Sequence, residues 1–471
     1  MNWNIEQLSF NKLSVAGMAT AIARTIAFAD VDIVLLLEVR QKNVGAAMTM
    51  LSTELNTVQP GTSGNNWLGY FLSEPTGKEL YAAFIRDLDA IRPVVVSSGP
   101  AGTSGSPLAD LRQNVFEIWP GSNFAATAYP VAAPTPTLPL CDVFVAAGRA
   151  AKRPRFGGRD IANGGYSFGN GFRLPALAMF WIHTAAGGDY LVPFVVCHYA
   201  AVRGSKKRNV LGQGQVAQLN QLHIAQLFND NPAAGGNSGY LDVYDPVANV
   251  HQAKLVEEVC FTGDFNVDFL DNLPAGGNVA RTNNAALMSL TPTTQGGGSA
   301  APAALPGAPA APPTLPYAGA QPPPLPANQM PAQVLRVAVT TQGTIQRKYP
   351  LPNPAPVTPP PAPYTSAAFD NFFYGGTRLT SATAAYGTGA VDSGQVVNVA
   401  PNIVRRVPAA AGQIDLRAVA AHYALLATKK AALAPKLQTG RRQPVLTADD
   451  RLIGARLISD HLPVVLTFTC P

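Results

Sequence analysis

The strongest constraint on the fold of this chain is an alanine-rich segment followed at once by a long apolar run. Residues Ala16–Phe28 have the composition of a helix, and Val31–Val39 contain an unbroken stretch of Ile, Val and Leu. Consecutive apolar residues over this length indicate a strand that is buried on both faces. A helix followed by such a strand is typical of the α/β (α+β) class.

Seven further segments have the length and composition of strands, and one more helix is expected over Val210–Phe228. These strand candidates are Leu80–Ile85, Val115–Ile118, Ala176–Ile182, Tyr190–Cys197, Glu258–Thr262, Asn371–Tyr374 and Leu462–Phe468. We interpret residues 1–471 as one domain that carries two insertions.

The two insertions are expected at residues 98–171 and 291–363. The first is rich in Gly, Pro, Ala and Ser, and the second holds twenty of the 42 prolines, so regular structure can run through little of it. Within the second, Val334–Thr340 and Thr344–Tyr349 can pair as a hairpin. We expect this insertion to lie outside the core; an interdomain linker is the alternative.

Composition, net charge and cysteine spacing indicate which partners and which cross-links the protein can have. Hydrophobic residues make up 47% of the chain and charged residues 13%, and the net charge of +6 mildly favours a polyanionic partner. The four cysteines show no C-x-x-C spacing, and Cys197 and Cys260 lie in apolar runs, which indicates buried thiols rather than a disulfide or zinc framework.

The N-terminal residues lack the basic stretch and apolar segment of a secretory signal. No uncharged apolar run reaches the about 20 residues that a membrane span needs. We therefore expect a soluble protein that is cytoplasmic or is exported by a route independent of a signal peptide.

Polar residues that can bind a metal or take part in catalysis stand at the ends of several expected strands. Glu38 ends the first apolar run, His198 ends another, and Gly263-Asp264-Phe265-Asn266 closes a third. Because Asp264 and Asn266 are two apart, their side chains point the same way. An adjacent Asp460-His461 pair opens the last strand. Taken alone, a histidine at a strand end is more often a core residue than a catalytic one.

Together with Asn4 in a first strand, this ordered set resembles the endonuclease/exonuclease/phosphatase superfamily. Its marks are an early Asn, a strand-end Glu, a strand-end His, Gly-Asp-x-Asn and a late Ser-Asp-His, and all are present in order. The resemblance implies a four-layer sandwich of two mostly antiparallel sheets flanked by helices. It also implies a metal-dependent phosphodiesterase whose site lies where strand ends converge.

The same resemblance implies the ligands of the metal and the residues around the water. Glu38 would hold Mg²⁺, or alternatively Mn²⁺ or Ca²⁺, with help from Asn4 and Asp460; such ions prefer oxygen ligands. Asp264 would orient or deprotonate the attacking water, and Asn266 would donate to a phosphate oxygen.

Two histidines backed by carboxylates complete the implied site. His461 would be oriented by Asp370, and His198 by Glu79. A carboxylate behind an imidazole fixes its tautomer and favours the cation, which suits a developing negative charge on phosphate.

Three segments resemble deoxyribonuclease I-type nucleases in particular: Glu38-Val39-Arg40, Phe172-Arg173-x-Pro175, and Ser73-Glu74-Pro75 with the following Lys78-Glu79. The resemblance implies that Arg40 contacts DNA, that Arg173 steadies the site, and that the third segment supplies Glu79. The chain departs from that enzyme in a shorter loop before Glu79, in Phe369 where a tyrosine is expected, and in its missing disulfide pattern.

A basic segment after His198 favours a nucleic acid as the partner. It contributes Arg203, Lys206, Lys207 and Arg208. Neutralisation of phosphates by such residues makes binding salt-dependent and largely blind to sequence, so we expect a DNA endonuclease of low specificity.

Two other functions remain open. A phospholipid, sphingomyelin or inositol-phosphate phosphodiesterase would share the same motifs, and a non-catalytic binding module would keep the fold alone. His183 also follows an apolar strand and is the residue most easily confused with His198.

Overall fold

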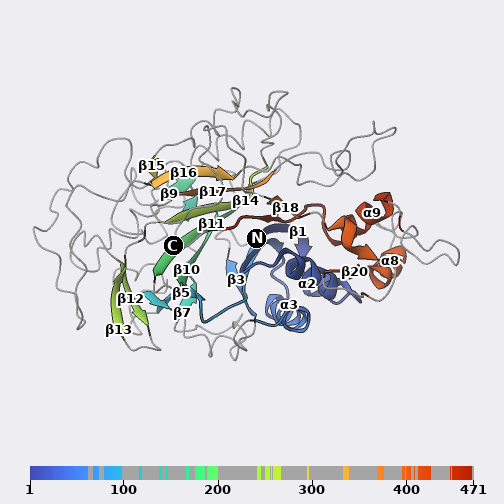
Figure 1. The fold of residues 1–471 in the computed structure, drawn as a ribbon, viewed down its shortest axis with the longest axis horizontal. Helices are drawn as coiled ribbons and strands as arrows, with labels where there is room; N and C mark the ends of the chain where they lie inside the picture. Colours follow the sequence, from blue (N-terminus) through green and yellow to red (C-terminus); the bar gives the residue numbers. More distant parts are fainter. Residues whose placement is uncertain are drawn as a thin grey trace, which may run out of the picture.

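The structure is a computed structural model of the chain. It describes residues 1–61, 67–73, 79–97, 116–118, 137–139, 144–146, 166–168, 175–185, 188–199, 241–245, 250–254, 256, 258–266, 294–295, 333–338, 369–375, 395–397, 399–404, 408, 412–425, 446 and 448–468. Figure 1 shows the described elements in colour.

The first sheet has six strands in the order β18-β21-β1-β2-β4-β3. In that order they span Gln395–Val396, Val464–Val465, Asn2–Leu8, Ile33–Val39, Leu80–Ile85 and Leu68–Ser73. Strands β1 and β2 are parallel, and the other neighbours are antiparallel. The first and last parts of the described chain thus share one sheet.

The second sheet has eleven strands in the order β13-β12-β6-β5-β10-β11-β14-β17-β16-β15, with β7 paired to β5. They span Val250–Lys254, Leu241–Asp245, Phe116–Ile118, Ile91–Ser97, Ala176–His183, Asp189–His198, Val259–Asp264, Asp370–Gly375, Gln333–Ala338, Thr294–Gln295 and, for β7, Thr137–Pro139. Strand β11 is parallel to β14, which brings the ends of both strands to the same edge.

Two pairs of short strands stand apart from these sheets, β8 (Phe144–Ala146) with β9 (Tyr166–Phe168) and β19 (Ile403–Val404) with β20 (Ile414–Asp415). The described helices gather beside the first sheet (Figure 1). They are α1 (Phe10–Leu13), α2 (Met18–Ala29), α3 (Val44–Val58), the 3₁₀ helix η4 (Ala400–Asn402), α8 (Arg417–Ala424) and α9 (Ala448–Ile458).

Alternation along β2 explains why the first sheet is buried on both faces. Leu35 and Leu37 pack with the apolar residues between the two sheets, whereas Val34 and Leu36 pack with those between the first sheet and the helices. Because successive side chains of a strand point to opposite faces, an unbroken apolar run is what this central position requires.

The expected sandwich of two mostly antiparallel sheets with helices is confirmed. The helix expected over Val210–Phe228 and the hairpin strand Thr344–Tyr349 lie outside the described residues. Strands β15 and β16 belong to the proline-rich segment and extend the second sheet at its edge. The last strand is shorter than expected, since β21 covers only two residues.

No helix among the described residues is both long and apolar enough to cross a membrane.

Gly263 in β14 sits where no side chain fits. Its φ is +146°, and a Cβ at this position would lie 1.8 Å from the carbonyl oxygen of Cys197 on β11. The close approach of β11 and β14 brings His198 level with Asp264. The glycine of Gly-Asp-x-Asn is therefore needed for strand pairing next to the strand-end carboxylate.

We predict that Gly263→Ala lowers the free energy of unfolding by more than about 3 kcal/mol, because backbone strain and a backbone clash act together. Urea denaturation provides the measurement. Gly17→Ala is the matched control, since Gly17 also has positive φ (+80°) but leaves ordinary van der Waals room for a Cβ; it should lose only about 1 to 2 kcal/mol. Equal losses in the two variants would contradict the steric argument.

Candidate active site

A bulge in β2 turns Glu38 out of the apolar alternation. Val34, Leu36 and Val39 all pack against the helices, so one extra residue stands between the last two. The pairing of β2 with β4 shifts register between Leu36 and Val39, and Glu38 has φ +59°. Such bulges re-aim side chains beside sites, and this one frees the Glu38 carboxylate from the helix-facing core.

Strand β1 carries a matching irregularity beside it. The pairing of β1 with β2 shifts register between Asn4 and Leu8, where Glu6 (φ +49°) and Gln7 (φ +60°) are both left-handed. The backbone N–H of Glu6 donates to Asn4 Oδ1, and that of Gln7 donates to Glu38 Oε2, each at 3.2 Å. The β1 bulge therefore holds the side chains of Asn4 and Glu38.

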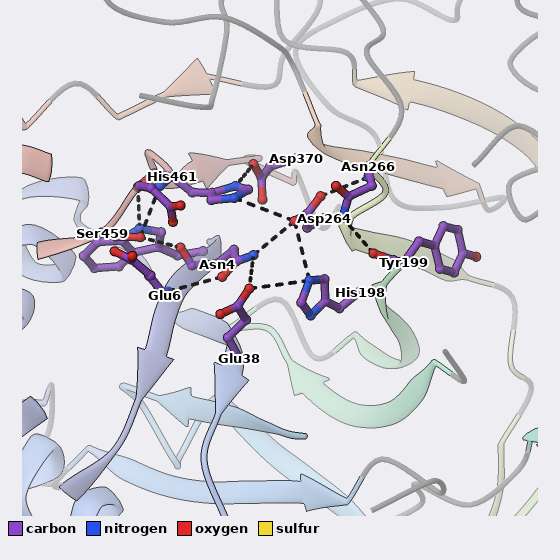
Figure 2. A network of polar contacts seen from close by, with 12 residues as sticks. Asn4, Glu6, Glu38, His198, Tyr199, Asp264, Asn266, Asp370, Ser459 and His461 are labelled. Atoms are coloured by element: carbon purple, nitrogen blue, oxygen red, sulfur yellow. Dashed lines mark hydrogen bonds and ion pairs between the residues drawn. The ribbon is translucent and has the colours of Figure 1, made fainter. Parts of the chain in front are cut away.

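Asp264 lies at the centre of the polar network in Figure 2. Its Oδ1 accepts from the backbone N–H of Asn266 at 2.9 Å, and its Oδ2 accepts from Asn4 Nδ2 at 3.0 Å. Asn4 Nδ2 also lies 3.3 Å from Glu38 Oε1. One amide group thus links carboxylates from the two sheets.

Two imidazoles face Asp264 Oδ2. The Nε2 atoms of His198 and His461 each lie 3.7 Å from this oxygen, and Figure 2 shows the rings on different sides of it. Each Nδ1 contacts a carboxylate at 2.7 Å, Glu79 behind His198 and Asp370 behind His461. A carboxylate on Nδ1 fixes the ring so that Nε2 faces the shared space.

Strand register explains how residues far apart in sequence meet here. Asp264 pairs with His198 on one neighbouring strand and with Asp370 on the other. His461 precedes β21 of the first sheet, and its backbone is tied to β1, because Ser459 Oγ donates to Asn4 O and accepts from His461 N. Both sheets therefore contribute to one site.

The donor set can hold a divalent cation. One ligand atom each from Asp264, Asp370 and His461 lie within 4.8 Å of one another, and all three residues are buried. Glu38 adds a carboxylate 3.6 Å from His198 Nε2. Oxygen-rich sites of this kind suit Mg²⁺, Mn²⁺ or Ca²⁺, and clustered carboxylates need positive charge to offset their repulsion.

The structure brings together most of the residues that the sequence singled out. These are Asn4, Glu38, Glu79, His198, Asp264, Asn266, Asp370 and His461. Asn266 also donates from Nδ2 to Tyr199 O at 2.7 Å, so one of its N–H groups has a protein acceptor. The predicted role of Asn266 as a phosphate donor would need its other N–H group.

Other predicted residues lie at the margin of the polar cluster or outside the described residues. The Asp460 carboxylate lies 3.2 Å from Arg456 Nη1, and Arg40 is exposed next to the bulge of β2, its backbone N–H donating to Leu8 O. Arg173, Arg203, Lys206, Lys207 and Arg208 lie outside the described residues.

His183 is separated from the site by the direction of its strand. It ends β10, which runs antiparallel to β11, so it pairs with Asp189 at the start of β11 rather than with His198 at its end. Its Nδ1 lies 2.7 Å from Asp189 Oδ1, and its side chain is 45% exposed. His183 and Asp189 thus form a third imidazole-carboxylate pair, which lies away from the cluster.

Sequence reasoning missed two supporting residues, Gln7 and Ser459. Ser459 stood in the Ser-Asp-His motif without a role of its own. For Gln7, the available signal was the spacing of Ile5 and Leu8, which both face the helices although they are three residues apart. That spacing indicates an extra residue in β1.

The pKa of His461 is raised from 6.5 to about 9. Burial acts in the opposite direction, but the negative charges of Asp370 and Asp264 and the hydrogen bond to Asp370 outweigh it, with a further contribution from Glu38. His461 is therefore a cation near neutral pH when no metal is bound.

We predict that stability of the metal-free protein falls as pH rises. The folded pKa lies above the unfolded value, so the stabilisation is fully present below about pH 6.5 and is lost as pH passes about 9. At about 1.4 kcal/mol per pKa unit, the loss is on the order of 3 kcal/mol. Urea denaturation in EDTA from pH 6 to 10 measures it, and His461→Gln should flatten the profile. An unchanged slope in that variant would refute the assignment.

Comparison of the sequence with protein-family models and with curated proteins gives no match. Among solved structures, the chain is similar to an endonuclease/exonuclease/phosphatase from Bacteroides vulgatus, at 11% identity and a TM-score of 0.35, over 100% of this chain and 97% of that one. It is also similar to a mannosyl-6-phosphatase from Bacteroides thetaiotaomicron, at 11% identity and a TM-score of 0.29, over 81% of this chain and 85% of that one.

A further similar structure is that of ANGEL2, a 2′,3′-cyclic phosphatase in complex with adenosine-2′,3′-vanadate. Its identity is 10% and its TM-score 0.29, over 80% of each chain. The solved structures to which this chain is similar thus include members of the endonuclease/exonuclease/phosphatase family.

Proposed function

We propose that this protein is a divalent-metal-dependent phosphodiesterase of the endonuclease/exonuclease/phosphatase type, and more specifically a DNA endonuclease. The observation that carries the proposal is the pair of carboxylate-backed imidazoles whose Nε2 atoms face Asp264 Oδ2 at 3.7 Å. This arrangement suits an anionic tetrahedral group, because positive charge and N–H donors converge on one position.

Water is the nucleophile that fits the described contacts. Ser459 Oγ, the hydroxyl in this network, is already engaged with Asn4 O and His461 N. Asp264 Oδ2 is a carboxylate oxygen in the middle of the cluster and can orient a water molecule and accept its proton. Hydrolysis by direct attack of water therefore requires no covalent intermediate with the protein.

The proposed step is an in-line displacement at phosphorus. The water oxygen forms a bond to phosphorus, the bond to the leaving oxygen breaks, the water proton passes to Asp264, and the leaving oxygen takes a proton from solvent. His461 Nε2 donates to a phosphate oxygen, and His198 does so from the other side. We place the divalent ion on Glu38, with Asn4 and Asp264 beside it, rather than on His461, because His461 Nδ1 is paired with Asp370 Oδ2 and its Nε2 is the proposed phosphate donor. An ion held there would supply Lewis-acid stabilisation of charge.

Basic residues that stand close to site residues in the sequence favour DNA over a small phosphoester. Arg40 is exposed two residues after Glu38, and the segment containing Arg203, Lys206, Lys207 and Arg208 follows His198 within ten residues. Basic side chains of this kind would contact phosphates on either side of a scissile bond, and such contacts carry no base information. Cleavage of low sequence specificity that weakens with salt is the expected behaviour.

We predict that the protein nicks supercoiled plasmid with Mg²⁺ or Mn²⁺ and not in EDTA. His198→Gln and His461→Gln should each reduce the rate about 100-fold or more, because each removes a donor to the transition state. His183→Gln is the matched control, since His183 makes the same Nδ1 contact with a carboxylate but lies outside the cluster; its rate should match that of the wild type.

Parallel reactions on RNA, phospholipid vesicles and p-nitrophenyl phosphate distinguish the substrate classes. If phosphocholine is released from vesicles while the plasmid stays intact, the protein is a lipid phosphodiesterase of the same chemistry and not a nuclease. No metal-dependent hydrolysis of any of these substrates would refute the enzymatic proposal and favour a binding module.

A further inference from the structure

Lys12 places a buried ammonium behind the site. Its residue is 9% exposed, and Nζ donates to the carbonyl oxygens of Ile5 and, at 2.9 Å, of Glu6. Burial of a charged group is costly unless strong acceptors receive it. The acceptors here belong to the β1 bulge, the same segment that holds Asn4 and Glu38.

The same two peptide groups connect Lys12 to the site. The carbonyl of Ile5 and the N–H of Glu6 belong to one peptide group, and the carbonyl of Glu6 and the N–H of Gln7 belong to the next. In a trans peptide the C=O and N–H bonds point in opposite directions. Lys12 takes both carbonyl ends, while the N–H ends donate to Asn4 Oδ1 and Glu38 Oε2.

The positive charge of Lys12 therefore acts on the side chains of Asn4 and Glu38 through the two peptide groups. A cationic donor on a carbonyl polarises the peptide group, which strengthens donation by the N–H at its other end, as in any chain of hydrogen bonds. It also stabilises the left-handed conformations of Glu6 and Gln7, which are costly for residues with a Cβ.

Local sequence explains how Lys12 reaches this position. Helix α1 begins after Ser9, whose Oγ accepts from the backbone N–H of Lys12 at 3.2 Å. Leu13, the next residue on the helix, is buried in the core between the first sheet and the helices. A short capped helix therefore turns the chain back so that Lys12 faces the bulge just before it.

We propose that Lys12 is a positioning residue that fixes Asn4 and Glu38 for cation binding through the two peptide groups of the β1 bulge. This inference rests on the proposed function, because it assigns Asn4 and Glu38 to a divalent-cation site. Lys12 itself contacts neither side chain in the described hydrogen bonds; it acts through the backbone.

The test is Mn²⁺ binding to the purified full chain without substrate, followed by electron paramagnetic resonance. Lys12→Met should raise the Kd for Mn²⁺ about tenfold, the scale of effect for residues that orient ligands. Lys12→Arg, which keeps charge and donors, should recover most of the affinity. Leu13→Ala is the matched control: it destabilises the same helix but keeps the ammonium, so its Kd should stay at the wild-type value.

A second measurement separates this inference from the proposed function. In the metal-free protein, Lys12→Met should shift the backbone amide resonances of Glu6 and Gln7 upfield, because their hydrogen bonds weaken. If Lys12→Met is too unstable to study, Lys12→Gln, a neutral donor, takes its place with the same expected directions.

The outcomes are distinct. Wild-type protein that binds no Mn²⁺ while the amide shifts occur as expected would refute the proposed cation site and leave the bulge mechanism standing. Normal Mn²⁺ affinity in Lys12→Met, or an equal loss in Leu13→Ala, would overturn the role of Lys12.

Discussion

The site depends on one buried carboxylate, that of Asp264. Its side chain is 3% exposed, and a charge so far from solvent persists only where donors and cations surround it. Asn4 and the Asn266 backbone supply the donors, and the imidazoles of His198 and His461 face it at 3.7 Å. The two sheets must therefore meet at this edge in one arrangement, because the donors come from both of them.

Backbone strain is concentrated at the same edge. Glu38 and Asn266 have positive φ, and Gly263 has a conformation that excludes a side chain. Strain of this kind persists only where the surrounding structure over-determines it. The apolar layers on both faces of the first sheet provide that support. Their packing stabilises the sandwich and offsets the strained backbone that points the polar side chains toward one another.

Much of this arrangement follows from sequence, but the direction in which Glu38 points does not. Apolar runs ending in Glu38, His198 and Asp264 indicate strands, and strand ends in one sheet meet at an edge. The direction in which Glu38 points depends on a bulge, and alternation alone would turn it toward the helices. The bulge has a signature in the spacing of Leu36 and Val39, whereas the support from Ser459 depends on a tertiary contact with Asn4 that no local pattern encodes.

We propose that acids and imidazoles from both sheets enclose one cation site. Anomalous scattering from crystals grown with Mn²⁺ tests it most directly. We predict a single strong peak within about 2.3 Å of a Glu38 carboxylate oxygen, between the side chains of Asn4 and Asp264. An empty site in Mn²⁺-saturated crystals, or an ion bound only elsewhere on the chain, would refute the proposed cation site.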